Sequence, residues 1–260
     1  SEIAADADRL SALLVVNHPG LPSGESCMGC GWTWGPEFAE SRGAYTASRN
    51  GPLLPGQPGF VEVVNGGAWK GTTLADGPFS GVAWWEVQLN AGRRYIALGG
   101  SDNHDARSPL DQPGSVGRPT TVVWASNLSQ AGIREGLLSG RVFIDMGADR
   151  SHVLDLTAEA RGVTYTMGAS VYPVTGEVNM KVLVAGIAAG RVRIIMDGRT
   201  VRLSDDSISA SRKEISFSVP YEGGDHWVRA EVRAPDGALL MLGNPIFLRS
   251  SRKAIVELSD

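Results

Sequence analysis

Asp102 and His104 stand two residues apart in the segment YIALGGSDNHDA, directly after an apolar stretch that ends in two glycines. Residues two apart in an extended chain point to the same side. A carboxylate and an imidazole on one side suit Zn²⁺, Mn²⁺ or Fe²⁺. Such an ion lowers the pKa of a bound water and polarises a phosphoryl or carbonyl oxygen. The alternative is a polar turn, with Asp102 bonded to the main chain and His104 in solvent.

A second histidine follows an apolar stretch in the same way. The segment LLVV, from Leu13 to Val16, leads into NHP, which contains His18. In α/β barrels the loops that follow parallel strands build the active site. We therefore expect His18, Asp102 and His104 to meet at the carboxyl ends of neighbouring strands and to bind a metal ion.

The elements that must position these residues alternate along the first half of the chain. Strand-like apolar runs are separated by long loops or by segments with helical periodicity, and this alternation predicts an α/β fold with largely parallel strands. The expected strands are residues 13–16, 60–66, 95–100, 120–125 and 141–145, and the expected helices are residues 81–92 and 127–140. The second helix is expected to bury Leu128, Ile133, Leu137 and Leu138.

Helical periodicity fades near residue 150. Short strand-like segments follow, and turn pairs such as Asp-Gly and Gly-Gly separate them. The segment IIMDGRTV predicts a hairpin with Asp197 and Gly198 in its turn. Strands at this spacing are typical of an antiparallel β-sandwich.

The change in pattern predicts two domains, an α/β part over residues 1–149 and a β-sandwich over residues 150–260. His152 and His226 lie in the second part, in segments that favour solvated turns.

Composition excludes some classes of partner. The chain has 260 residues and a formal net charge of −4, without a long basic run, which argues against binding nucleic acid. It has no apolar run near the roughly 20 residues that span a bilayer. Cys27 and Cys30 are too few for a structural zinc site, so a redox pair, a local disulfide and two ordinary thiols all stay open.

The ordered series VVNHP, VEVVNG, LGGSDNHD, VGRPTTVVWA and GLLSGRVFID resembles the carboxyl-terminal half of PHP-domain metallohydrolases, in particular the CehA/McbA-like branch. The resemblance covers roughly residues 10 to 250. It implies an α/β partial barrel, the second half of a distorted β/α barrel, followed by an antiparallel β-sandwich. His18, Asp102 and His104 are the implied ligands, and Asp102 would also orient the metal-bound water for catalysis.

The same resemblance implies an activity. It implies a metal-dependent phosphoesterase that acts on a small-molecule ester, with two or three divalent ions (Zn, Mn or Fe) in the complete site. Hydrolysis of a carbamate or carboxyl ester is the main alternative.

The chain departs from the family pattern in one large respect. The opening HxH motif of the family, a TDH-like segment and a further Glu and His are missing. We therefore expect the second half of a longer protein, whose amino-terminal half is on the same or on a separate chain. A catalytically inert binding or assembly subunit is the other interpretation.

Other residues are weaker candidates for substrate contacts. Asn65 ends the VEVVNG strand and could contact substrate or cap a turn, and Arg118 could pair with a phosphate oxygen or form a surface salt bridge. Trp32 and Trp34 could form a substrate wall or pack under their glycine-rich loop. Glu62 could line the cavity, but a structural role is the preferred interpretation.

Overall fold

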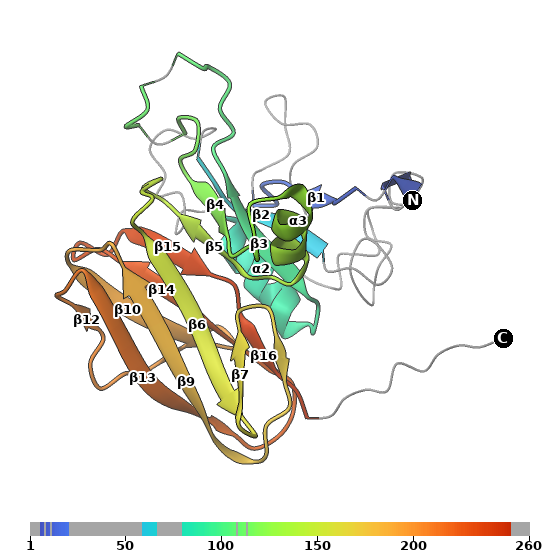
Figure 1. The fold of residues 1–260 in the computed structure, drawn as a ribbon, viewed down its shortest axis with the longest axis vertical. Helices are drawn as coiled ribbons and strands as arrows, with labels where there is room; N and C mark the ends of the chain where they lie inside the picture. Colours follow the sequence, from blue (N-terminus) through green and yellow to red (C-terminus); the bar gives the residue numbers. More distant parts are fainter. Residues whose placement is uncertain are drawn as a thin grey trace.

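The computed structural model describes residues 6–7, 9–10, 12–20, 59–66, 80–107, 109–112 and 114–250. These residues form three sheets, with three, nine and four strands (Figure 1). Within them, no helix is long and apolar enough to cross a membrane.

The three-stranded sheet is parallel. It contains β1 (Val15–Val16), β2 (Gly59–Asn65) and β3 (Tyr95–Gly100) in that order. Six of the seven residues of β2 are buried, as expected for a parallel strand that is covered on both faces. The parallel pairing predicted for these strands is confirmed, and it places their carboxyl ends at one edge of the sheet.

Helix α2 (Gly81–Asn90) links this sheet to the rest of the molecule. The Ser80 side chain accepts a hydrogen bond from the Val82 N–H and caps the first turn. Trp84 and Trp85 are buried in a core with residues of β2 and of the outer face of the nine-stranded sheet.

Two side-chain contacts fix α2 against that outer face. The Arg229 guanidinium donates to Glu86 of the helix at 2.7 Å, and the Trp227 indole N–H donates to Asn90 at 2.8 Å. Because Arg229 is itself buried, its pairing with Glu86 and with buried Glu231 satisfies a charge that would otherwise be costly.

The next two strands differ from the prediction. β4 (Thr120–Val123) and β5 (Val142–Asp145) were expected in the parallel part, but they pair antiparallel with each other, and β5 pairs antiparallel with β15 (Leu239–Gly243). They are thus the end of the nine-stranded sheet, which crosses the position expected to separate the two domains.

The remaining strands build a β-sandwich. The nine-stranded sheet runs β11-β10-β14-β15-β5-β4, with β12, β16 and β8 joined to it, and faces the sheet β13-β9-β6-β7. The bounds are β6 (Val153–Ala160), β7 (Val163–Thr166), β8 (Ser170–Val171), β9 (Gly176–Ala185), β10 (Gly190–Met196), β11 (Arg199–Val201), β12 (Ser207–Ile208), β13 (Arg212–Tyr221), β14 (His226–Arg233) and β16 (Ile246–Leu248).

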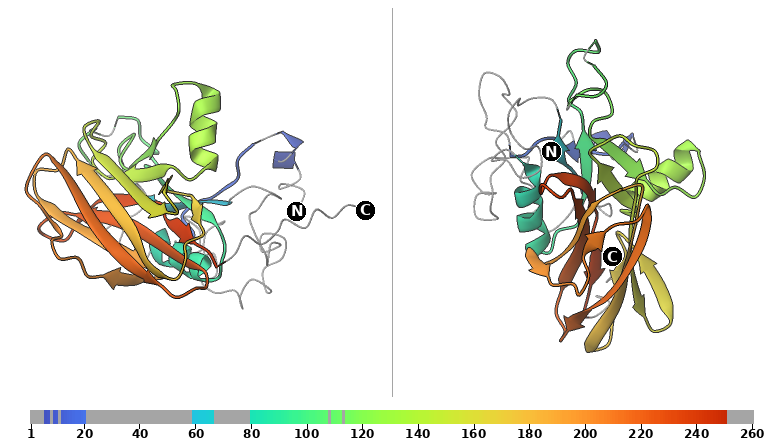
Figure 2. Two further views of the ribbon diagram at one scale, coloured as in Figure 1. Left: turned by 60° about the horizontal axis from the view of Figure 1, so that its bottom comes forward. Right: turned by 90° about the vertical axis from the view of Figure 1, so that its left-hand side faces the viewer.

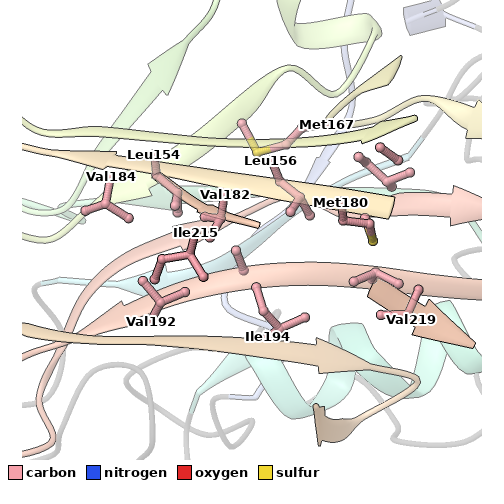
Figure 3. Packing of buried hydrophobic residues seen from close by; sticks show 14 of the residues in the cluster. Leu154, Leu156, Met167, Met180, Val182, Val184, Val192, Ile194, Ile215 and Val219 are labelled. Carbon is pink, nitrogen blue, oxygen red and sulfur yellow. The ribbon is translucent and has the colours of Figure 1, made fainter. Parts of the chain in front are cut away.

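Alternating residues of these strands fill the space between the two sheets. Leu154, Leu156 and Val182 from one sheet face Val192 and Ile194 from the other (Figure 3). The predicted hairpin is also confirmed: β10 and β11 pair through Met196 and Arg199, with Asp197 and Gly198 at φ 51° and 80° in the turn.

Hydrogen bonds from side chains, rather than main-chain hydrogen bonds between paired strands, join β3 of the parallel sheet to the sandwich. The Asn244 amide accepts from the Ala97 N–H at 2.8 Å and donates to the carbonyls of Ala97 and Val142, both at 3.0 Å. The Thr121 hydroxyl bonds both the N–H and the carbonyl of Gly99 in the same way. These side chains satisfy the free main-chain groups of β3 where it meets β4 and β5.

Helix α3 (Gln130–Leu138) packs through two glycines and through only two of the four predicted apolar residues. A Cβ atom at Gly132 or Gly136 would clash with main-chain atoms of residues 124 and 127, so only glycine permits this approach. Leu128 is 97% exposed and Ile133 37% exposed, whereas Leu137 and Leu138 pack on a small core. The expected apolar side is therefore only half correct, and Figure 2 shows the yellow-green helix on the outside of the molecule.

Candidate functional site

Three predicted site residues lie at the carboxyl ends of the parallel strands. His18 follows β1, Asn65 ends β2, and Asp102 follows β3. Because the strands are parallel and adjacent, these ends share one edge of the sheet. This edge is called the strand-end site below.

Glu62 of β2 holds the strand-end site together. Its Oε2 accepts the main-chain N–H of His18 and the side-chain amide of Asn65, each at 3.1 Å. The Glu62 side chain also lies against Gly100, where a Cβ atom would overlap Oε1. One buried carboxylate thus contacts the ends of all three parallel strands.

Charge links the same residues. Burial raises the pKa of the Glu62 carboxyl, while the Asn65 amide and the His18 ring and N–H lower it. The nearby Asp102 carboxylate adds to the rise. Both His18 and Asp102 therefore act electrostatically on the Glu62 carboxyl.

The main chain is strained at two of the predicted ligands. His18 has φ 33° and Asp102 has φ 48°, in the left-handed region that residues other than glycine seldom adopt. Such conformations cost about 1–3 kcal/mol each and often mark functional positions.

His104 points away from this group. Its Nδ1 lies 2.7 Å from the main-chain oxygen of Asp102 and 3.8 Å from the Asp102 carboxylate. The His104 side chain is 83% exposed, whereas that of Asp102 is 25% exposed. The structure thus places His18 and Asp102 at the strand-end site, but the side chains of Asp102 and His104 do not point toward the same position, contrary to the prediction.

The donor types at the strand-end site fit a divalent cation, since imidazole and carboxylate suit Zn²⁺, Mn²⁺ and Fe²⁺. Their arrangement is less complete. Among the described residues, no group of three or more His, Cys, Asp or Glu is placed to hold an ion. The assignment of His18, Asp102 and His104 as metal ligands stays a prediction.

The predicted substrate contacts have different outcomes. The Asn65 amide bonds to Glu62, which gives it a structural partner. Arg118 is half-buried and its main chain packs against Gly66, directly after Asn65, so it lies beside the site. Trp32, like Trp34 and the two cysteines, lies outside the described residues.

His152 and His226 are not the solvated turn residues that the sequence suggested. His152 Nδ1 lies 2.8 Å from the buried Asp145 carboxylate, and His226 Nδ1 lies 2.6 Å from Asp197. Both pairs lie in the sandwich part of the chain, and each histidine is largely shielded from solvent.

Glu62 makes structural contacts, as the sequence favoured, and they lie between the ends of the parallel strands. A signal for it was present in the sequence, because a glutamate within the apolar run FVEVV is expensive to bury without a partner. In a parallel strand covered on both faces, such a residue indicates a buried polar contact rather than a solvent face.

The comparisons with known proteins find distant neighbours. No family model and no curated protein matches the sequence. A solved two-domain protein from Bacteroides vulgatus, described as containing a predicted PHP-like metal-dependent phosphoesterase, is 17% identical, with a TM-score of 0.36. The match covers 94% of this chain and 63% of that protein, less than two thirds of its length.

A second solved neighbour, the fibronectin(III)-like modules of Clostridium thermocellum CbhA, is 16% identical, with a TM-score of 0.26. It covers 37% of this chain and 94% of the modules. At such low identities and TM-scores, neither neighbour assigns an activity to this chain.

Proposed function

We propose that this chain carries the site of a metal-dependent hydrolase that cleaves small phosphoesters with a metal-activated water. One observation carries the proposal: three adjacent parallel strands end with His18, Asn65 and Asp102 at one edge, around the buried carboxylate of Glu62. Ligands at the carboxyl ends of parallel strands are where α/β proteins build active sites.

The proposed roles follow from the chemistry of each side chain. His18 and Asp102 would hold a zinc, manganese or iron ion, and His104 would join them after its exposed side chain turns toward the site. Such an ion would supply an acidified water and polarise the phosphoryl oxygen. Asp102 would also accept a hydrogen bond from the attacking water and orient it. Arg118, beside the site, would pair with phosphate oxygens through its planar guanidinium.

Bound metal per chain, measured by elemental analysis after incubation with Mn²⁺ or Zn²⁺ and dialysis, tests this proposal first. We expect metal on the parent chain and its loss in His18→Ala and Asp102→Asn. Asp105→Asn is the matched control, because Asp105 is an exposed carboxylate that pairs with Arg107. A parent chain without metal, or an Asp102→Asn variant that retains it, would refute the ligand assignment.

Turnover then separates the candidate substrates. The loaded chain is assayed with an aryl phosphate and with an aryl carbamate of the same leaving group. Faster loss of the phosphate supports a phosphoesterase, and faster loss of the carbamate supports an ester hydrolase of the other class. Bound metal without either activity would instead support a catalytically inert subunit.

A further inference from the structure

We propose that a cavity beside helix α2 is a second binding site, which takes a small molecule with a phosphate or carboxylate group. The cavity has a volume of about 300 Å³, at the lower end of the range for small-molecule sites. It lies between α2 and the outer face of the nine-stranded sheet, and its charged lining residues are Arg193, Arg229, Arg233, Glu86 and Glu231. The residues of the strand-end site do not line it, so this proposal does not depend on the proposed function.

Charged side chains form the floor of the cavity. Arg229, Glu231 and Arg233 alternate along β14, so they share one face of the sheet. Arg229 is 3% exposed and Glu231 is 2% exposed, whereas charged residues are seldom buried unless they are paired. Arg193 of β10 stands directly opposite Glu231 in the antiparallel pairing of the two strands. The sheet therefore holds a group of charges in fixed positions beneath α2.

Positive charges outnumber negative charges in this group. The Glu231 Oε2 atom accepts a hydrogen bond from Arg229 at 2.8 Å, and its Oε1 atom lies 2.7 Å from Arg233 and 3.1 Å from Arg193. Glu86 pairs with Arg229 at 2.7 Å. Burial opposes the charge of Glu231, but Arg229 and Arg233 outweigh it and hold the pKa of the carboxyl below its ordinary value. Three arginines and two ionised glutamates thus leave one positive charge at the cavity, in a chain whose net charge is −4.

Arg193 is the cation best placed to meet a ligand. Its side chain is 42% exposed, whereas that of Arg229 is 4% exposed. Its Nη1 atom contacts Glu231, and its Nη2 atom donates to the Thr200 hydroxyl at 3.2 Å. Each of these nitrogens carries a second N–H, so Arg193 can keep both contacts while it donates to a ligand. The planar guanidinium matches the oxygens of phosphate and carboxylate groups, which defines the class of ligand.

A purely structural role accounts for Arg229 and does not account for Arg193. Arg229 joins α2 to the sheet, because it binds both Glu86 of the helix and Glu231 of the strand. Arg233 already gives Glu231 a second partner. A third guanidinium at the same carboxylate adds a positive charge that the two glutamates do not balance, and like charges at this distance repel. An oxyanion in the cavity would balance that charge.

Calorimetric titration of the chain with inorganic phosphate and, separately, with citrate tests the proposal. Metal is first removed on a chelating resin, so that an ion at the strand-end site does not contribute, and ionic strength is held constant. We expect the parent to bind, and Arg193→Gln to bind at least about 10-fold more weakly, as is typical when a charged hydrogen-bond partner is lost. The probe with the higher affinity shows whether phosphate or carboxylate is the preferred group.

Arg212→Gln is the matched control. Arg212 is an exposed arginine of the other sheet and pairs with Glu214 at 3.4 Å. The two variants have the same net charge, so a difference between them reports on the cavity rather than on the overall charge of the chain. Arg212→Gln should bind both probes as the parent does.

Two outcomes would overturn the proposal: a parent chain that binds neither probe, or parent-like affinity in Arg193→Gln. If Arg193→Gln fails to fold, Ala83→Glu and Ala83→Gln replace it. Ala83 lines the cavity from an exposed position of α2, so glutamate there cancels the surplus charge and glutamine does not. Ala83→Glu should then bind more weakly than Ala83→Gln, and equal affinities would overturn the proposal. The proposed metal site is tested separately by the elemental analysis.

Discussion

Replacing Asn244 by leucine should weaken the joint between the parallel sheet and the sandwich. The Asn244 amide makes three side-chain hydrogen bonds there, two to Ala97 and one to Val142, and all three residues are almost fully buried. Leucine has a similar size and cannot form these bonds. The substitution therefore removes the bonds without opening a cavity that water could fill.

The magnitude follows from the groups left without partners. Ala97 loses the partner of its N–H and of its carbonyl, whereas the Val142 carbonyl keeps a bond from the Asn244 main-chain N–H at 3.2 Å. A buried main-chain group without a partner costs about 1–3 kcal/mol, so the two orphaned groups of Ala97 should cost about 3 kcal/mol together. In a chain of this size, that lowers the melting temperature by roughly 6–12 °C.

Thermal unfolding monitored by tryptophan fluorescence measures this loss. Asn103→Leu is the matched control, because Asn103 is half-exposed and, among the described residues, its amide donates only to the Gly114 carbonyl, at 2.8 Å. It should cost less than about 1 kcal/mol, as surface changes usually do. Equal melting temperatures for the two variants would refute the view that Asn244 replaces a missing strand ladder.

Two further predictions concern the sandwich part. Gly168→Ala should destabilise the chain by more than about 3 kcal/mol, because Gly168 has φ +82° and a Cβ atom there would overlap the Ser139 carbonyl. Gly162→Ala is the control: Gly162 has φ +75° but open space around it, so the change should cost about 1–2 kcal/mol. Equal losses of stability in thermal unfolding would contradict this prediction. Partial burial opposes the charge of His226, but the Asp197 carboxylate outweighs it and raises the pKa of His226 in the folded state. The stabilisation is therefore complete below the ordinary histidine pKa and lost as pH rises through the raised value, so the melting-temperature gap between parent and His226→Gln should shrink from pH 5.5 to 8.5, and a constant gap would refute it.

Local patterns in the sequence predict most of the parallel sheet. The expected strands 13–16, 60–66 and 95–100 correspond to β1, β2 and β3, and their order along the chain is their order in the sheet. The hairpin at Asp197 is equally local, because a two-residue Asp-Gly turn suffices to define it.

The pairing of β4 and β5 was not predictable in this way. A strand, a helix and a strand form the same local pattern whether the strands pair parallel or antiparallel. The partner of β5 on its other side is also distant in sequence, because residues 241–243 of β15 pair with residues 143–145 across about a hundred residues. In α3, the apolar pattern suggested a leucine-lined face, but the close approach at Gly132 and Gly136 decides how the helix packs.

The sequence predicts where in the sheet the candidate strand-end site lies, but not the direction of each of its side chains. Parallel strands place His18 and Asp102 at one edge, and spacing alone anticipates this. The two-residue spacing of Asp102 and His104 also predicted that their side chains point the same way, but this prediction holds only if the chain between them is extended. Because Asp102 has φ 48°, the chain turns there and His104 faces solvent.

The position of Asn244 in the sequence also bears on how the chain is synthesised. Its amide satisfies Ala97, which precedes it by 147 residues. A chain leaving the ribosome therefore leaves these groups of Ala97 without their partner until nearly all of the described residues have emerged, because Asn244 comes late. Long-range closure of this kind slows folding and prolongs exposure of unpaired strand edges. The main-chain groups of Ala97 in the nascent chain thus wait for Asn244 before their hydrogen bonds are complete.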